Sequence, residues 1–275
     1  MRCYYVLVSM CRLLGIVSSE PTDFRIVLRE APLSMAALSK EHPDGWGIAV
    51  FDAEVRGWCV EKGVACACED ARFHQLAAGS RGGVLVAHVR QKTVGETSLA
   101  NTHPFERGRW VFAHNGTVKD VDWLRKNSSR ERLAEIAGET DSELLFAWVL
   151  TRLDEAGVAA QPASEATDRA LGAAARMARD KTGFGGFNFL LSDGTTTYAH
   201  RLGRTLHLLD RGPGDEVRTR RRAHDGTVFE TPWSERRLAV FIASERMTDE
   251  PWQRVEEGTL LRIDRVPVPH WRLVA

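Results

Sequence analysis

Met10 and Cys11 form the pair of residues with the most distinctive chemistry in this sequence, because a methionine directly precedes a cysteine that opens an apolar segment. If translation begins at Met10, removal of that methionine leaves Cys11 with both its thiol and a free α-amine. The pKa of an α-amine is about 8, close to that of a thiol. Such a cysteine carries its own general base, so the pair predicts a nucleophile that needs no neighbouring histidine.

The sequence begins nine residues before Met10, which leaves the nitrogen of Cys11 in a peptide bond, where it cannot act as a base. Arg2 and the apolar residues after it suggest a signal peptide, but Arg12 interrupts the stretch and no small-residue cleavage site follows. A lipoprotein signal would need a small residue where Met10 stands. We therefore interpret residues 1–10 as an extra segment, either a misassigned start, which we favour, or a short pro-segment.

Further polar residues lie at the ends of predicted strands or at the start of a predicted helix. Arg90 follows one strand, Asn115 and Gly116 follow another, and Asp141 lies in the first turn of a helix. Taken alone, each has a simpler explanation, such as a surface ion pair, a hairpin turn or a favourable charge at a helix N-terminus. Together with the Cys11 thiol, they could hold an amino acid by both ends while the thiol attacks it.

The elements that position these residues are predicted as strands, then helices, then more strands. Thr140 and Glu143 have the spacing of a capping box that opens a helix. Other helices are expected over 33–40, 71–78 and 163–181. Strands are expected at 11–18, 46–51, 56–62, 84–89, 110–114, 187–191, 196–200, 206–209, 238–243, 260–263 and 271–274. This order predicts α+β layers rather than alternating βαβ units.

Composition excludes several classes of protein. The formal net charge of the 275 residues is zero, which argues against a nucleic-acid binder that works through bulk positive charge. No apolar run approaches the roughly 20 residues of a membrane-spanning helix. Five irregularly spaced cysteines do not suggest a disulfide scaffold and favour a reducing cytoplasmic setting. Cys66 and Cys68 are too close together for the usual zinc knuckle, so we expect neither a metal nor a cofactor.

Six short motifs follow one another along the chain: Met10–Gly15, His42–Gly47, Ala87–Arg90, Asn101–Phe105, Phe112–Gly116 and Glu139–Glu143. In this order they resemble the class II glutamine amidotransferases, which are N-terminal-nucleophile hydrolases, and in particular their stand-alone members. Phe187–Gly194 and Ile242–Glu245 also fit this subgroup. The resemblance implies a four-layer αββα sandwich, in which two antiparallel sheets lie between helices. It also implies a single amidotransferase domain over residues 11–275.

The resemblance assigns roles to the matching residues. Cys11 would attack the side-chain amide of glutamine and form a γ-glutamyl thioester, releasing ammonia before water frees glutamate. The Asn115 side chain and the Gly116 N–H would form the oxyanion hole. Arg90 would bind the substrate α-carboxylate in a bidentate pair, and Asp141 would bind the α-ammonium group.

Two further residues match the family, and two positions depart from it. Thr93 matches a substrate-contacting threonine, and His103 matches a histidine that supports a loop. Relatives attached to synthase domains often have Arg-Trp where this chain has Arg90–Gln91, and His-Gly where it has Val94–Gly95. We therefore expect the loop that covers glutamine to close differently in this chain.

Three functions remain open at the level of sequence. The chain could release ammonia from glutamine as the glutaminase subunit of a separate synthase. It could instead hydrolyse a γ-glutamyl amide in a small peptide or thiol metabolite, since the glutamyl end of both substrates is the same. The third alternative is a catalytically silent module that binds glutamine. A synthase subunit and a second copy of the chain are the protein partners expected, with no nucleic acid and no membrane.

Overall fold

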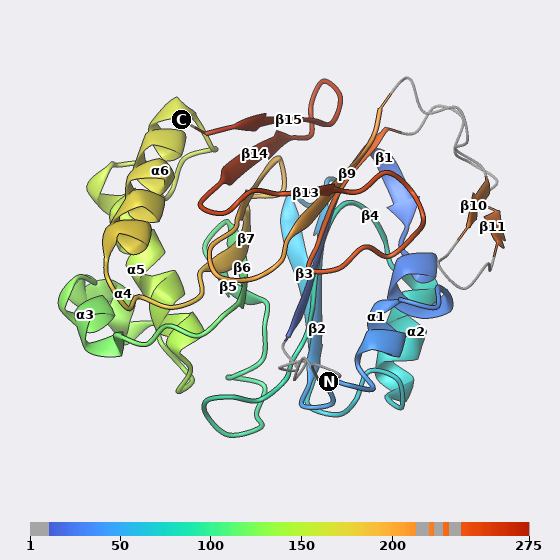
Figure 1. Cartoon of the computed structure of the whole chain (residues 1–275), viewed down its shortest axis with the longest axis horizontal. Coiled ribbons are helices and arrows are strands. Elements are labelled where there is room, and N and C mark those ends of the chain that lie inside the picture. Colours follow the sequence, from blue (N-terminus) through green and yellow to red (C-terminus); the bar gives the residue numbers. More distant parts are fainter. Residues whose placement is uncertain (1–10, 213–219, 223–227, 231–237, 275) are drawn as a thin grey trace, which may run out of the picture.

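Two antiparallel sheets face each other in the computed structural model, and helices cover the outer face of each (Figure 1). The structure describes residues 11–212, 220–222, 228–230 and 238–274. The first sheet has the strand order β13-β9-β12-β1-β4-β2-β3, and the second has the order β15-β14-β8-β7-β6-β5. Strands β10 and β11 form a separate hairpin.

The strands of the first sheet are β1 (Arg12–Asp23), β2 (Trp46–Asp52), β3 (Gly57–Gly63), β4 (Arg81–Val89), β9 (His207–Arg211), β12 (Ala239–Ala243) and β13 (Gln253–Arg254). Those of the second are β5 (Phe105–Arg107), β6 (Trp110–Asn115), β7 (Asn188–Ser192), β8 (Thr196–His200), β14 (Leu260–Asp264) and β15 (His270–Leu273). The hairpin consists of β10 (Arg220–Arg222) and β11 (Val228–Glu230).

The helices lie in two groups. On the first sheet lie the short π-helical turn η1 (Ile26–Glu30), α1 (Met35–Leu38) and α2 (Ala71–Gly79). On the opposite side of the molecule lie α3 (Val121–Lys126), α4 (Arg130–Ala134), α5 (Asp141–Glu155) and α6 (Glu165–Asp180) (Figure 1).

Three apolar cores separate the layers. Phe112 of the second sheet stacks on Phe146 of α5, with 4.9 Å between the ring centroids, and both belong to the core that also contains Trp148. A second core lies between the sheets, and a third lies between the first sheet and helices α1 and α2. Burial of apolar side chains on both faces of each sheet provides the main stabilisation of such layers. The predicted four-layer αββα sandwich is confirmed.

Alternation along the strands decides which side chains face the opposite sheet. In β1, Leu13 and Val17 belong to the core between the sheets, whereas Leu14 and Ile16 pack toward the helices. Successive side chains of a strand point to opposite faces. The same alternation in β4 sends Val84 and Val86 between the sheets. Residues that continue these inward rows past the strand ends can therefore meet at one edge of the sandwich.

Most predicted elements are present, with corrections at several boundaries. β1 extends to Asp23, five residues beyond the predicted end. Helices α3 and α4 and strands β5 and β13 were not predicted. The capping box is only half correct: Thr140 Oγ1 accepts a hydrogen bond from the Glu143 N–H at 3.2 Å. The Glu143 carboxylate instead accepts from the backbone N–H groups of Ala137 and Gly138 and pairs with Arg107.

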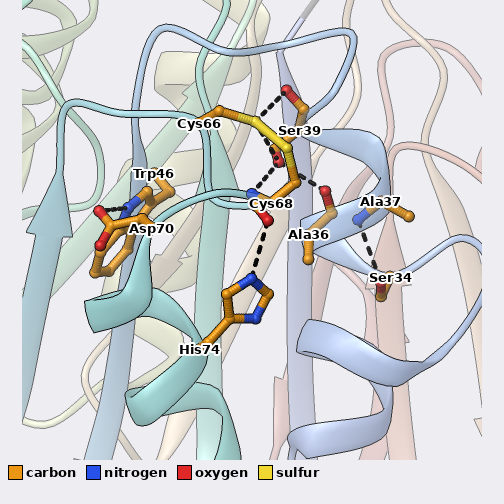
Figure 2. Close-up of a disulfide and its surroundings, with 9 residues drawn as sticks. All are labelled: Ser34, Ala36, Ala37, Ser39, Trp46, Cys66, Cys68, Asp70 and His74. Atoms are coloured by element: carbon orange, nitrogen blue, oxygen red, sulfur yellow. Dashed lines mark hydrogen bonds between the residues drawn. A yellow bond between two sulfur atoms is a disulfide. The ribbon is translucent and has the colours of Figure 1, made fainter.

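Cys66 and Cys68 form a disulfide, a pairing that was not predicted from the sequence (Figure 2). Ser39, at the end of α1, holds this segment, because its hydroxyl accepts a hydrogen bond from the Cys68 N–H at 2.9 Å. The bridge closes a loop of only three residues, so it joins neighbouring parts of one segment and does not link the layers of the fold. Within the described residues, no helix is long and apolar enough to cross a membrane.

Candidate active site

The Cys11 thiol lies against the backbone that follows β4. β1 and β4 pair with Arg12 opposite Val89, and this register continues with Cys11 opposite Arg90, next to Gln91. The Gln91 N–H donates to Cys11 Sγ at 3.3 Å, and the thiol lies 3.4 Å from the Gln91 carbonyl oxygen. Burial raises the pKa of the Cys11 thiol, and the Gln91 N–H and the Arg90 charge oppose this effect only in part. The thiol therefore needs a base to become a nucleophile near neutral pH.

Arg90 is buried next to Cys11, with only 3% of its surface exposed. Its backbone N–H donates to the Gly45 carbonyl at 2.7 Å, and its carbonyl accepts from the Asp44 N–H at 3.1 Å. The guanidinium donates to the carbonyl oxygens of Val94 at 2.9 Å and Glu96 at 3.3 Å. A guanidinium has five N–H donors, so these two bonds leave donors for an anionic ligand.

Asn115 ends β6 on the row that faces the other sheet, since Val111 and Ala113 of the same row belong to the core between the sheets. Its Nδ2 donates to Ser244 Oγ at 3.2 Å, and the same Oγ accepts from the Leu13 N–H at 3.0 Å. Ser244 thus connects the Asn115 carboxamide to the strand that begins immediately after Cys11.

Gly116 follows Asn115 at a point where the backbone of another segment approaches closely. A Cβ atom added to Gly116 would lie 2.5 Å from the Gly186 carbonyl oxygen and 2.8 Å from His114 Nε2. Every other residue would therefore push the Gly116 backbone away from its present place. This close approach explains the glycine without reference to a hairpin turn, and β6 leads instead into helix α3.

Asp141 and His114 connect the start of α5 to the end of β6. Asp141 Oδ2 accepts a hydrogen bond from the Val118 N–H at 2.6 Å. His114 Nε2 lies 2.9 Å from the Gly186 carbonyl oxygen and donates to it, because a carbonyl can only accept. His114 Nδ1 then accepts from the Ser142 hydroxyl at 2.8 Å. These bonds fix the Asp141 carboxylate relative to the Asn115–Gly116 backbone.

Buried histidines surround this region. The rings of His88 and His103 lie 4.3 Å apart between centroids, and the His103 ring also packs on Phe105. Burial lowers the pKa of His88 to about 3 and that of His42 to about 4. The pKa of His103 also lies well below its ordinary value, mainly because of burial. All three imidazoles are therefore neutral at pH 7, and the role of His103 as a loop-supporting residue stays a prediction.

We expect these histidines to make the fold sensitive to acid. In the unfolded chain they bind protons near pH 6.5, whereas in the folded protein His88 does so only near pH 3 and His42 near pH 4. The unfolded state binds more protons in this interval, so folding stability is complete above about pH 6.5 and declines as the pH falls toward 4. Each such histidine contributes at most about 1.4 kcal/mol per pH unit.

Urea unfolding at pH 7.5 and pH 5 measures this effect. We expect the free energy of unfolding to be lower at pH 5, and the decline to be smaller in His88→Gln. His270, which is exposed, serves as the matched control, and His270→Gln should keep the wild-type decline. An equal free energy of unfolding at the two pH values in the wild type would contradict neutral burial of these rings.

Hydrogen bonds connect several of the predicted site residues. Cys11 bonds to the backbone of Gln91, next to Arg90, and the Ser244 hydroxyl links β1 to Asn115. Asp141 is held by the Val118 N–H. Thr93, by contrast, is exposed in the loop after Arg90 and makes none of the hydrogen bonds found among the described residues. Its contact with the substrate stays a prediction.

Asn101 and Ser244 lie within two of the family motifs, but the sequence alone predicted no role for either residue. Asn101 Nδ2 donates to the Glu96 carbonyl at 2.9 Å, and its Oδ1 accepts from the Glu139 N–H at 2.7 Å. It thereby fastens the loop that Arg90 organises to the segment that precedes α5. Its place beside His103 in one motif was the signal that could have identified it.

A family model described as "Glutamine amidotransferases class-II" matches residues 10–267. Uncharacterized protein MJ1515 of Methanocaldococcus jannaschii is 30% identical over 263 residues, which cover 92% of this chain and 68% of that protein. Gamma-glutamyl-hercynylcysteine sulfoxide hydrolase of Mycobacterium tuberculosis is 30% identical over 217 residues, which cover 74% of this chain and 82% of the hydrolase.

A solved structure also resembles the chain along its length. The protein described as a predicted glutamine amidotransferase from Pseudomonas aeruginosa PA01 has a TM-score of 0.64 and 26% identity, and the match covers 96% of this chain and 100% of that one. The family match extends over nearly all the described residues, including every residue discussed around Cys11. The chain belongs to the class-II glutamine amidotransferases.

Proposed function

We propose that the protein hydrolyses the side-chain amide of glutamine, or of a γ-glutamyl compound, through a γ-glutamyl thioester on Cys11. One observation carries the proposal: the strand that follows the Cys11 thiol and the Asn115 carboxamide share one hydrogen-bonding partner, the Ser244 hydroxyl. The buried Arg90 guanidinium lies beside the same thiol. These contacts support the assignment of Cys11 as the nucleophile, Asn115 as the oxyanion donor and Arg90 as the anion-binding group.

The first half of the reaction forms the thioester. The α-amine of Cys11 takes the thiol proton, and the sulfur attacks the side-chain carbonyl carbon of the substrate. The oxyanion of the tetrahedral intermediate is stabilised by Asn115 Nδ2 and the Gly116 N–H, where preorganised donors act most strongly. The intermediate then expels ammonia or an amine, which receives the proton from the Cys11 ammonium.

The second half regenerates the enzyme. The Cys11 amine takes a proton from water as the water attacks the thioester carbonyl. Glutamate leaves, and the proton returns to the sulfur. The raised pKa of the buried thiol makes such a base necessary, and the low pKa values of His42 and His88 make these rings poor candidates for it.

This mechanism requires that Cys11 become the first residue, as we propose. Residues 1–10 lie outside the described residues, and we interpret them as an extra segment, with residues 11–275 forming the amidotransferase domain. N-terminal sequencing of the protein expressed from its own gene tests this. We expect chains that begin at Cys11, and full activity in chains that retain Met1 would contradict the self-activated nucleophile.

Arg90 and Asp141 would bind the two ends of the glutamyl group. We expect Arg90→Lys to lower kcat/KM about 30-fold or more, chiefly through KM, because one ammonium cannot form a bidentate pair with a carboxylate. Arg72→Lys is the matched control, since Arg72 pairs with Glu61 at the surface. Steady-state kinetics with glutamine measure both variants. An unchanged KM in Arg90→Lys would remove Arg90 from substrate binding.

A second candidate substrate class is supported by the relative from Mycobacterium tuberculosis, whose name specifies hydrolysis of a γ-glutamyl compound. The glutamyl group would occupy the same contacts, and only the leaving group would differ. Parallel assays of ammonia release from glutamine and of cleavage of γ-glutamyl dipeptides separate the two. A kcat/KM at least tenfold higher for the dipeptides would assign the protein to γ-glutamyl hydrolysis.

A further inference from the structure

Ser244 lies directly after β12, and each of its polar groups is engaged. Its side chain is buried, and its Oγ accepts hydrogen bonds from the Leu13 N–H at 3.0 Å and from Asn115 Nδ2 at 3.2 Å. Its own N–H donates to the Leu13 carbonyl at 3.1 Å, and its carbonyl accepts from Thr205 Oγ1 at 3.0 Å. The hydroxyl therefore has a fixed place between the two sheets.

The position of Ser244 follows from strand alternation. Val240 and Ile242 of β12 belong to the core between the sheets, and Ser244 continues their row past the strand end. Asn115 continues the row of Val111 and Ala113 in the same way from the opposite sheet. The contacts between the ends of these two rows are polar, whereas the contacts further along the rows are apolar. A small side chain with a hydroxyl therefore suits this position.

The hydrogen bond to Ser244 restricts the Asn115 carboxamide. An amide nitrogen has two hydrogens, so one can point to Ser244 while the other remains for a developing oxyanion. Without the hydroxyl, the terminal torsion of an asparagine is broad and roughly two-fold, and the amide would sample other orientations. Ser244 Oγ also accepts from the backbone N–H of Leu13, two residues after Cys11. One atom therefore fixes the position of the Asn115 amide relative to the strand that follows the nucleophile.

A chain of contacts supports Ser244 from the other side. Asn188 lies opposite Asn115 in the β6–β7 pair, and its Nδ2 donates to the Thr205 carbonyl at 3.1 Å. Thr205 Oγ1 in turn donates to the Ser244 carbonyl. The serine is thus held by a network that joins both sheets, and this rigidity is what an orienting group needs.

We propose that Ser244 is a positioning residue that orients the Asn115 carboxamide for oxyanion stabilisation. The inference rests on the proposed function, because it assigns the oxyanion to Asn115. Ser244 itself would touch neither substrate nor leaving group, and its effect on the rate would pass through Asn115. Loss of its hydroxyl should therefore lower kcat and leave substrate capture by Arg90 and Asp141 in place.

Steady-state kinetics of Ser244→Ala, Asn115→Ala and the double variant test this role. We expect Ser244→Ala to lower kcat about tenfold, the effect of one well-placed neutral hydrogen bond, with KM changed less than about twofold. In the double variant, loss of Ser244 should add nothing to the effect of Asn115→Ala, because the two residues act as one unit. Ser244→Thr, which keeps the hydroxyl, should recover part of the loss.

Two controls make the result specific. Ser128→Ala, which removes a serine hydroxyl that donates to the Leu124 carbonyl of α3, should keep the wild-type kcat. Alkylation of Cys11 by iodoacetamide does not use an oxyanion hole, and its rate should be equal in Ser244→Ala and wild type. If Ser244→Ala does not fold, Ser244→Cys gives the same comparison with a weaker acceptor of similar size.

The possible outcomes are distinct. A wild-type kcat in Ser244→Ala, or a double variant in which the two losses multiply, would overturn the role of Ser244 and leave the proposed function intact. A slower alkylation in Ser244→Ala that accounts for the whole loss of kcat would place the effect on the thiol and also overturn it. Absence of turnover in the wild type would overturn the proposed function, and the role of Ser244 with it.

Discussion

Replacing Cys11 with alanine is expected to abolish turnover of glutamine and of γ-glutamyl substrates. The substitution removes the atom that forms the thioester, and no other thiol lies beside the Asn115 carboxamide within the described residues, where Cys59 is exposed on β3 and Cys66 and Cys68 are joined. We expect a loss of about 10⁴-fold or more, the size of effect that follows removal of a nucleophile that acts with its base as a unit. Ammonia release measured by a coupled assay gives the rate.

Substrate binding should survive the loss of the thiol. Arg90 and Asp141 would still hold the two ends of the glutamyl group. We therefore expect the Kd of Cys11→Ala for glutamine to lie within a few-fold of the Kd of the wild type for a glutamine analogue that is not turned over. Cys59→Ser is the matched control, because this exposed thiol takes no part in the proposed reaction. Turnover in Cys11→Ala above one-hundredth of the wild-type rate would exclude thioester chemistry at Cys11.

Replacing Asn115 with alanine is expected to produce the second largest effect on the reaction. Loss of one donor from an oxyanion hole typically lowers kcat by about 10²–10³. The donor acts only on charge that develops in the transition state, so KM should change little. The Gly116 N–H would remain as a second donor, which is why some activity should persist. Steady-state kinetics with glutamine measure the split between kcat and KM.

Asn127→Ala provides the control for this substitution. Asn127 ends α3, where its Nδ2 donates to the Trp123 carbonyl at 2.8 Å, and its loss should change stability but not the catalytic step. Asn115→Asp is the more exacting variant, because it places a negative charge where the oxyanion would form. If Asn115→Ala raised KM and left kcat unchanged, Asn115 would be a binding residue and the oxyanion would lie elsewhere.

Those parts of the fold and site that depend on local pattern could be predicted from the sequence. The buried runs that became β1, β4 and β6 are continuous and apolar, and polar residues at their ends mark where chemistry can occur. Strand alternation then brings Cys11 and Asn115 to the same edge. The order of the predicted elements indicated α+β layers, and the resemblance to the family implied two antiparallel sheets between helices, which the structure bears out.

Features that depend on contacts between distant segments could not be predicted in the same way. Ser244 meets Leu13 across 231 positions of sequence and Asn115 across 129, so no local pattern marks its hydroxyl. Glu143 has the spacing of a capping residue, but Arg107 of β5 and two backbone N–H groups compete for its carboxylate. In both places tertiary packing decides which partner a polar group finds.

The loop after Arg90 shows the same limit. The resemblance to the family predicted a loop that covers glutamine, and the Arg90 guanidinium and the Asn101 side chain organise the loop through the carbonyl oxygens of Val94 and Glu96. The exposure of Thr93 was not predictable, because a loop has no periodicity that separates inward from outward positions. The role of Thr93 rests on the motif match alone and stays a prediction.

Peptide mapping of the protein after reaction with an electrophilic glutamine analogue tests the central claim most directly. The account predicts one adduct per chain, located on Cys11, in chains whose first residue is Cys11, with loss of ammonia release in proportion to labelling. Excess glutamine should slow the labelling, because both ligands would bind Arg90 and Asp141. Retained activity without an adduct at Cys11, or an adduct confined to Cys59, would contradict the account.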